Sequence, residues 1–234
     1  MQNRYQALAA QLPQNIDAVL ITSEWNRRYF TGLSSTAGYL FITKEAQYFI
    51  IDFRYIEIAK RTIKGCEVLL QQSLPEQLNE LLLRHHVEKI AIETSYMTVG
   101  EKNYFAEILP KAEIVEDDTA DQLILAMRSI KSEDDIVAIR KAQSITDAAF
   151  TEILNFIAPG KTEKEIAAYL EYTMKRLGAE NLAFDSIVVG GPNSALPHGI
   201  PGERPIQKGD FLTLDFGAKY DGYCSDMTRT VAVG

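Results

Sequence analysis

The sequence is poor in cysteine and contains no long apolar run. Only two cysteines, Cys66 and Cys224, occur in 234 residues, and they lie far apart without the spacing of a metal-binding motif. Two reduced thiols are therefore expected in preference to a disulfide. No apolar run approaches the roughly 20 residues of a membrane span. No signal-peptide core follows Met1, so we expect a cytoplasmic protein.

Positive charge is also scarce. The chain has 24 Lys and Arg against 32 Asp and Glu, which gives a formal net charge of −8. Nucleic-acid-binding proteins need clustered Lys and Arg to neutralise phosphates, so this balance argues against a nucleic-acid partner. What is present is typical of a globular protein: 46% of the residues are hydrophobic and 24% are charged. The length suffices for one large domain or two ordinary ones.

The first half of the sequence predicts strands that alternate with helices. Apolar runs typical of strands cover residues 18–22, 39–43, 47–51, 67–70 and 89–93. Helices are expected over residues 4–12, 53–63, 75–85 and 98–109. The short spacer at residues 44–46 predicts a hairpin, so the sheet should be mixed rather than purely parallel. We therefore expect an α/β domain with a mixed sheet over residues 1–128.

The second half begins with two predicted helices. Ser132 with Asp135, and Thr162 with Glu165, have the spacing of capping boxes. A strand is expected over residues 183–189 and is followed by a glycine-containing loop. This loop lacks the Lys-Ser/Thr pair of a phosphate-binding loop and precedes no clear helix, so we reject a nucleotide site.

Residues 211–230 have the pattern of a β-hairpin. Alternating residues rich in Thr, Phe, Leu and Tyr flank Asp221-Gly222, a common turn pair. Asp215 should point to the face opposite the apolar residues of its strand. If the turn is centred between Tyr220 and Asp221, then Asp215 lies directly opposite Asp226.

Two carboxylates in this relation need a compensating charge. Directly opposed side chains have Cβ atoms roughly 4.5–5.5 Å apart, and like charges at that distance destabilise a sheet. A divalent cation would offset the repulsion between Asp215 and Asp226, because carboxylate oxygens are natural metal ligands. The residues alone leave two alternatives open: a general acid–base pair with separated pKa values, and an exposed ribbon with two solvated acids.

Three motifs, in the right order, resemble a known family. Residues 213–217, with Asp226 eleven residues after Asp215, resemble the first metal motif of the pita-bread metallopeptidases. The closest similarity is to their proline-specific group, Xaa-Pro dipeptidase and aminopeptidase P, which residues 193–199 and 26–32 also resemble. The resemblance implies a creatinase-like α/β N-terminal domain over residues 1–128. It also implies the first half of an α+β pita-bread domain over residues 129–234.

The same resemblance implies a site and a substrate. Members bind two divalent metals, commonly manganese or cobalt, through two Asp, one His and two Glu. Asp215 and Asp226 match the two aspartates, so they are the expected metal ligands. His198 matches a catalytic histidine that donates a hydrogen bond to the substrate carbonyl or to the tetrahedral intermediate. The implied reaction is metal-dependent hydrolysis of the peptide bond before proline, in peptides with proline in second position.

The resemblance also implies a homodimer, in which the N-terminal domain assists dimerisation and shapes the substrate entrance. Trp25 and residues 26–32 would then lie near a partner subunit's active site, although simple packing of Trp25, Tyr29 and Phe30 is an equally open interpretation.

The resemblance implies that the remaining ligands, one His and two Glu, fall in motifs beyond Gly234. About the last third of the family's usual chain would then be missing, so we expect weak or absent metal binding and little turnover from this chain. Two other functions stay open. One is a non-catalytic pita-bread module that binds or assembles with partners. The other is a creatinase-like amidinohydrolase without metal, which the two aspartates disfavour.

Overall fold

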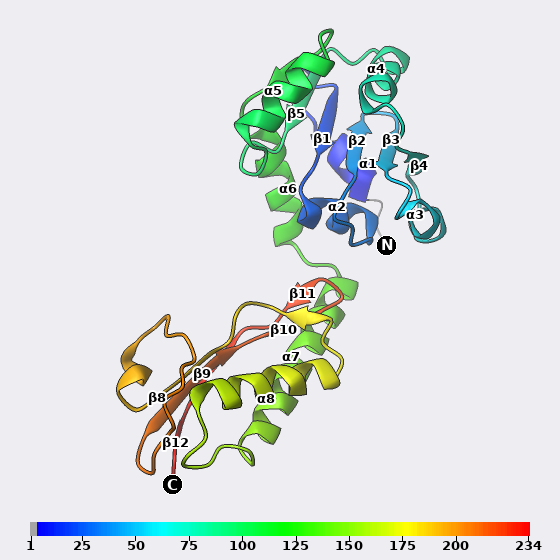
Figure 1. Cartoon of the computed structure of the whole chain (residues 1–234). Helices are drawn as coiled ribbons and strands as arrows, with labels where there is room; N and C mark the ends of the chain where they lie inside the picture. Colours follow the sequence, from blue (N-terminus) through cyan, green and yellow to red (C-terminus); the bar gives the residue numbers. More distant parts are fainter. Residues whose placement is uncertain (1–3) are drawn as a thin grey trace. The chain divides into compact units, whose positions relative to one another are not determined.

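The computed structural model describes residues 4–234 and divides the chain into two compact units, Met1–Ile130 and Lys131–Gly234 (Figure 1). Each unit has its own hydrophobic core. Within residues 4–234, no helix is long and apolar enough to cross a membrane. Cys66 and Cys224 belong to different units, and both are free thiols. Burial raises the pKa of the Cys66 thiol to about 12, so little reactive thiolate exists at neutral pH.

Among the described residues, unit 1 is built on a six-stranded sheet with the order β4-β3-β2-β1-β5-β6. The strands are β1 (Ala18–Ile21), β2 (Tyr39–Thr43), β3 (Gln47–Ile51), β4 (Glu67–Leu70), β5 (Lys89–Ile92) and β6 (Glu113–Val115). Strand β2 is antiparallel to both of its neighbours, whereas the other pairs are parallel. The predicted β2–β3 hairpin and the predicted mixed sheet are therefore confirmed.

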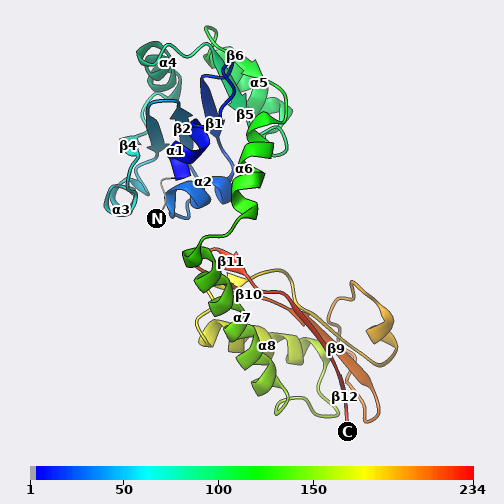
Figure 2. The same ribbon diagram turned by 180° about the vertical axis from the view of Figure 1, so that it is seen from behind.

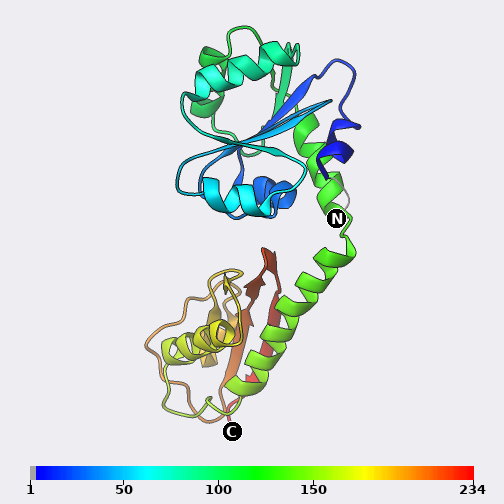
Figure 3. The same cartoon turned by 90° about the vertical axis from the view of Figure 1, so that its right-hand side faces the viewer.

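Helices cover both faces of this sheet (Figure 3). They are α1 (Arg4–Ala9), α2 (Glu24–Thr31), α3 (Ile56–Thr62), α4 (Leu74–Arg84), α5 (Val99–Ile108) and α6 (Thr119–Ser129). Because side chains alternate along a strand, Val19 and Ile21 join the core formed with α1, α2, α3 and α6. Ala18 and Leu20 point the other way, into the core formed with α4 and α5. This two-sided burial explains why β1 is apolar throughout.

Unit 2 packs two helices, α7 (Glu133–Ile153) and α8 (Glu163–Arg176), against a long β-hairpin (Figure 2). Both predicted capping boxes are present, with Ser132 and Thr162 as the N-cap residues. The described strands form two three-stranded sheets, in the orders β12-β9-β8 and β11-β10-β7. They are β7 (Asn181–Leu182), β8 (Ile187–Gly190), β9 (Phe211–Phe216), β10 (Ala218–Tyr220), β11 (Tyr223–Cys224) and β12 (Met227–Ala232).

The hairpin is present, but its register differs from the prediction. Asp221 and Gly222 have φ angles of 46° and 77°, and positive φ at both central positions is typical of a type I′ turn. The turn is therefore centred between these two residues rather than between Tyr220 and Asp221. As a result Asp215 pairs with Thr228, and the prediction that Asp215 lies directly opposite Asp226 is wrong.

Gly217 marks the junction where β9 passes into β10. A Cβ atom on this residue would lie 2.1 Å from the carbonyl oxygen of Ser225, so only glycine fits here without a shift of backbone. The buried Ser225 hydroxyl accepts a hydrogen bond from the Ala218 amide at 2.9 Å and lies 2.5 Å from the Thr146 hydroxyl on α7. The hairpin is thus fixed to α7 at this junction.

We expect Gly217→Ala to lower the free energy of unfolding by about 3 kcal/mol, the upper end of the overpacking range. The atom that the new methyl group meets is a backbone oxygen, which cannot rotate away. Urea denaturation followed by circular dichroism measures the change. Gly100→Ala is the matched control, because a Cβ there meets nothing closer than 3.9 Å. This control should be neutral or stabilising by up to about 1 kcal/mol, and equal losses in both variants would contradict the close contact.

Candidate metal centre

The candidate site lies on the face of sheet β12-β9-β8 that points away from the helices. Leu212, Leu214 and Phe216 of β9 are fully buried in the core shared with α7 and α8. Asp215 alternates with them and therefore points to the opposite face, as the sequence predicted. Its neighbours across the sheet are Ile187 on β8 and Thr228 on β12.

Asp226 belongs to the same face. Asp226 directly precedes β12. Ser225 and Met227 are buried, whereas Asp226 and Thr228 are exposed, so the alternation of β12, carried back by one residue, puts Asp226 on the side of Thr228 and hence of Asp215. Because Thr228 is the residue opposite Asp215, Asp226 occupies a diagonal position. Such positions are about 7–8 Å apart in an antiparallel pair, which a bridging cation can span.

One oxygen of Asp215 is left without a partner. Its Oδ1 atom is buried and accepts no hydrogen bond from any group in residues 4–234. A buried acceptor in this state costs about 1–3 kcal/mol relative to a satisfied one. Coordination of a cation would remove this penalty, so the Asp215 carboxylate fits the role of a metal ligand.

Two aspartates by themselves do not make up a complete metal site. Across residues 4–234, no group of three or more His, Cys, Asp or Glu side chains is arranged to hold a metal ion. Protein sites for divalent cations commonly use at least three or four protein ligands. Asp215 and Asp226 therefore fit as part of a site, and their role as ligands stays a prediction.

His198 lies in an exposed turn after the 3₁₀ helix Gly191–Ala195. The next residue, Gly199, is buried, and a Cβ atom there would lie 2.7 Å from Cγ1 of Val189, so the loop rests directly on β8. Val189 pairs with Thr213, whose side chain is on the same face as that of Asp215. The loop that carries His198 thus covers the face of the sheet on which Asp215 lies.

An ion pair between Arg204 and Asp210 stabilises the segment that leads from this loop back to β9. Oδ2 of Asp210 accepts hydrogen bonds from Nη1 of Arg204 and from the amide of Gln207, both at 2.8 Å. The bond from the Arg204 guanidinium holds the pKa of the Asp210 carboxyl below its usual value. Gly191 leaves room for this pair, because a Cβ on it would lie 2.5 Å from Nη2 of Arg204.

The N-terminal motif, residues 26–32, covers helix α2 from its third residue to its C-cap in unit 1. Arg27 is buried and donates hydrogen bonds to the carbonyl oxygens of Thr22, Ser35 and Gly38. Burial lowers the pKa of Arg27. Gly32 ends α2 in the left-handed conformation, with φ 73°. The motif therefore determines the shape of the loop over residues 32–38.

The aromatic residues of α2 differ in burial. Phe30 is buried in the core of unit 1 and Tyr29 packs against it, which confirms the packing interpretation for these two residues. Trp25 is 57% exposed. Its placement near a partner subunit stays a prediction.

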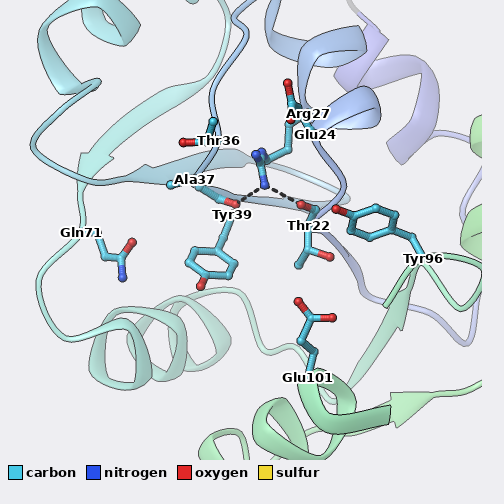
Figure 4. Close-up of a pocket in the computed structure, with 10 residues that line it drawn as sticks. Thr22, Glu24, Arg27, Thr36, Ala37, Tyr39, Gln71, Tyr96 and Glu101 are labelled. Carbon is cyan, nitrogen blue, oxygen red and sulfur yellow. Dashed lines mark hydrogen bonds between the residues drawn. The ribbon is translucent and has the colours of Figure 1, made fainter. Parts of the chain in front are cut away.

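A cavity of about 280 Å³ opens next to Arg27 in unit 1 (Figure 4). The side chains of Tyr96 and Glu101 point toward Thr22, the residue that follows β1. Burial raises the pKa of Tyr39. The cavity is a polar hollow of unit 1, whereas His198, Asp215 and Asp226 belong to unit 2. Sequence reasoning gave no sign of it, because its residues come from separate segments of the chain.

Comparison with known proteins accounts for both units. Residues 4–130 match the Creatinase/Prolidase N-terminal domain, and residues 137–234 match Metallopeptidase family M24. The chain belongs to metallopeptidase family M24, in the group with a creatinase/prolidase N-terminal domain. The resemblance drawn from the sequence motifs is thus confirmed, and so is the fold of an α/β domain followed by part of a pita-bread domain.

Several relatives in family M24 are similar over nearly all of this chain. The Xaa-Pro dipeptidase of Pyrococcus horikoshii is 39% identical over 94% of this chain and 61% of its own length. The putative Xaa-Pro aminopeptidase of Mycoplasma pneumoniae is 35% identical over 93% of this chain and 60% of its own length.

Solved structures of the family agree with this fold. The Xaa-Pro dipeptidase from Bacillus anthracis superposes with a TM-score of 0.93 at 38% identity, over 99% of this chain and 64% of that one. The prolidase from Pyrococcus furiosus gives 0.87 at 34% identity, over 97% and 69%. The chain spans 60–62% of the length of three curated relatives that it matches.

We expect Asp215→Thr to raise the free energy of unfolding by about 1 kcal/mol, because it removes a buried acceptor that lacks a partner. Threonine also suits a strand better than aspartate. Asp226→Thr is the control, and it should change stability by less than about 0.5 kcal/mol because Asp226 is exposed. Urea denaturation without added metal tests both variants. A large loss of stability in Asp215→Thr would show that the carboxylate has a partner.

The Asp210–Arg204 pair predicts a pH dependence of stability. The folded state lowers the pKa of Asp210, so its stabilising effect is present above the unfolded value of about 3.9 and is lost as the pH falls through the folded value. Wild type should therefore be more stable than Asp210→Asn at pH 6, and the gap should close at lower pH, below about 4. Thermal unfolding at a series of pH values measures this gap. Asp185→Asn, at an exposed position, is the control variant.

Proposed function

We propose that this chain provides the Asp-Asp metal motif and the substrate histidine of an Xaa-Pro metallopeptidase, which hydrolyses the peptide bond before proline. The observation that carries the proposal is the outer face of sheet β12-β9-β8. On that face Asp215 has a buried oxygen with no hydrogen-bond partner in residues 4–234, Asp226 is its diagonal neighbour, and the loop with His198 lies over the same surface. The names of the relatives, Xaa-Pro dipeptidase and Xaa-Pro aminopeptidase, support the substrate class.

Each residue has a distinct proposed role. Asp215 and Asp226 would hold divalent cations such as manganese or cobalt, which supply Lewis-acid polarisation of the scissile carbonyl and activation of water. The exposed His198 side chain would donate a hydrogen bond to the carbonyl oxygen of the substrate, where negative charge develops. The substrates would be peptides with proline in second position.

The proposed assembly is a homodimer in which unit 1 assists dimerisation and shapes the substrate entrance. Trp25, whose side chain is exposed, and residues 26–32 would then lie near the active site of a partner subunit.

Two carboxylates form only part of a dinuclear site. The 234-residue polypeptide should therefore bind manganese weakly, with a dissociation constant above about 10⁻⁴ M, and should show little turnover on its own. Mn²⁺ titration of the ¹⁵N-labelled chain tests the binding, because the paramagnetic ion broadens nearby resonances. Broadening should centre on residues 213–217 and 226–228. It should disappear in Asp215→Asn and remain in the control Asp147→Asn, at an exposed position on α7.

Hydrolysis of an Xaa-Pro peptide by the same chain, with its intact mass determined, tests the activity. Little or no product is expected. Hydrolysis that Asp215→Ala abolishes would show that other residues or a second chain complete the site. Hydrolysis that Asp215→Ala leaves unchanged, or that needs no metal, would overturn the proposal. A lack of metal dependence in a completed chain would revive the amidinohydrolase alternative.

A further inference from the structure

Glu163 is a fully buried carboxylate at the start of helix α8. Ionisable side chains rarely occupy such positions unless they are paired or hydrogen-bonded. The N-cap of α8 is Thr162, and the capping-box carboxylate is that of Glu165. Glu163 is therefore not needed to cap its own helix, and its side chain turns instead to another segment of unit 2.

Both carboxylate oxygens of Glu163 accept hydrogen bonds from the segment that carries His198. Oε1 accepts from the amide of Gly190 at 2.8 Å and from Nδ2 of Asn193 at 3.1 Å. Oε2 accepts from the amide of Gly202 at 2.9 Å. Hydrogen bonds to a charged acceptor are roughly twice as strong as neutral ones, so these contacts form a firm three-point attachment.

The attachment points lie at the two ends of one loop. Gly190 is the last residue of β8 and Gly202 begins the return toward β9, with His198 between them. Backbone contacts reinforce the second end, because the Lys164 amide donates to the Gly202 carbonyl at 3.1 Å. A single side chain thus ties together both ends of the loop over residues 190–202.

The loop is close-packed around these contacts. A Cβ atom on Gly202 would lie 3.3 Å from Oε2 of Glu163, and one on Gly190 would lie 2.9 Å from Cγ2 of Ile206. Gly199 rests on Val189 between the two ends. The loop is therefore held at its start, at its middle and at its end, and only the outer side chains, including His198, remain exposed.

We propose that Glu163 is a positioning residue, which holds the 190–202 loop through Gly190, Asn193 and Gly202 so that His198 stays over the Asp215 face of the sheet. The catalytic relevance of this position rests on the function proposed above for His198. The positioning itself concerns only contacts within unit 2.

A carboxylate suits this position better than an amide, because all three of the partners named above are hydrogen-bond donors. The side chain of Gln has one acceptor oxygen and one NH₂ group. In Glu163→Gln the oxygen can serve one end of the loop, and the NH₂ group must then face a donor at the other end. This substitution therefore releases one end of the loop with almost no change in volume.

Nuclear magnetic resonance of the labelled 234-residue chain tests the proposal directly. The sequence contains three histidines, so the imidazole region holds three sets of signals, and His85 and His86 of unit 1 are internal references. In Glu163→Gln the imidazole signals of His198 should shift while those of His85 and His86 stay in place. The order parameter of the His198 amide should fall from about 0.85 to below about 0.6. Amide exchange at Gly190 or Gly202 should accelerate at least tenfold.

Glu165→Gln is the matched control on the same helix. Its carboxylate accepts a hydrogen bond from the amide of Thr162 at 2.7 Å. Within the described residues it forms no hydrogen bond to the 190–202 loop. The control makes the same chemical change two residues away and weakens the cap of α8. The signals of His198 should remain those of the wild type.

Gly202→Ala is a second variant that leaves the Glu163 charge in place. Its methyl group would crowd Oε2 at 3.3 Å and lengthen the Gly202 contact, so His198 should respond in the same direction to a smaller extent. If the spectrum of Glu163→Gln is not dispersed and the variant is therefore unfolded, the response of His198 in Gly202→Ala decides whether Glu163 positions the loop.

A decrease in thermal stability with unchanged His198 signals would overturn the proposal, since Glu163 would then be a structural residue only. Equal changes in Glu163→Gln and Glu165→Gln would overturn it as well. The test needs no substrate or metal, so a failure to hydrolyse Xaa-Pro peptides would count against the proposed function and not against the positioning.

Discussion

The alternation of side chains along β9 is the constraint on which the site depends. Leu212, Leu214 and Phe216 enter the core with α7 and α8, so Asp215 must emerge on the opposite face. A slip of one residue would move the carboxylate into the core and three large apolar side chains out of it. Burial of each such side chain contributes about 1.5–3 kcal/mol, and the core therefore holds Asp215 in place far more strongly than any contact that Asp215 makes itself.

Part of this stability is given up at the site. Asp215 keeps a buried oxygen without a partner among residues 4–234, and Asp226 places a second negative charge diagonally across the same ribbon. Neither arrangement helps the polypeptide to fold. Departures from local stability rules are expected where a chain binds a ligand, so the unfavourable features of this face agree with its proposed role.

Sequence patterns predicted the fold class, the hairpin and the outward face of Asp215, because all three follow from periodicity. The register was wrong because the turn was centred one residue too early, between Tyr220 and Asp221. The Asp221-Gly222 pair is itself typical of the two central positions of a type I′ turn, so the sequence contained the signal for the observed register. Glu163 was missed for another reason. The capping spacing of Thr162 and Glu165 accounted for the start of α8, and nothing local to that segment indicated a contact with Gly190 or Gly202.

Both units use one buried charged side chain to hold the backbone of a loop, with opposite signs. Arg27 donates to three carbonyl oxygens around residues 22–38, whereas Glu163 accepts from two amides and one side-chain amide around residues 190–202. A charge buried in this way is stable only while its partners are in place, so each loop has one strongly preferred conformation. Arg27 and Glu163 bind mainly backbone groups, so the outward-facing side chains of each loop are not needed to hold its conformation. His198 can therefore remain exposed on a loop whose backbone is fixed by hydrogen bonds to the buried Glu163.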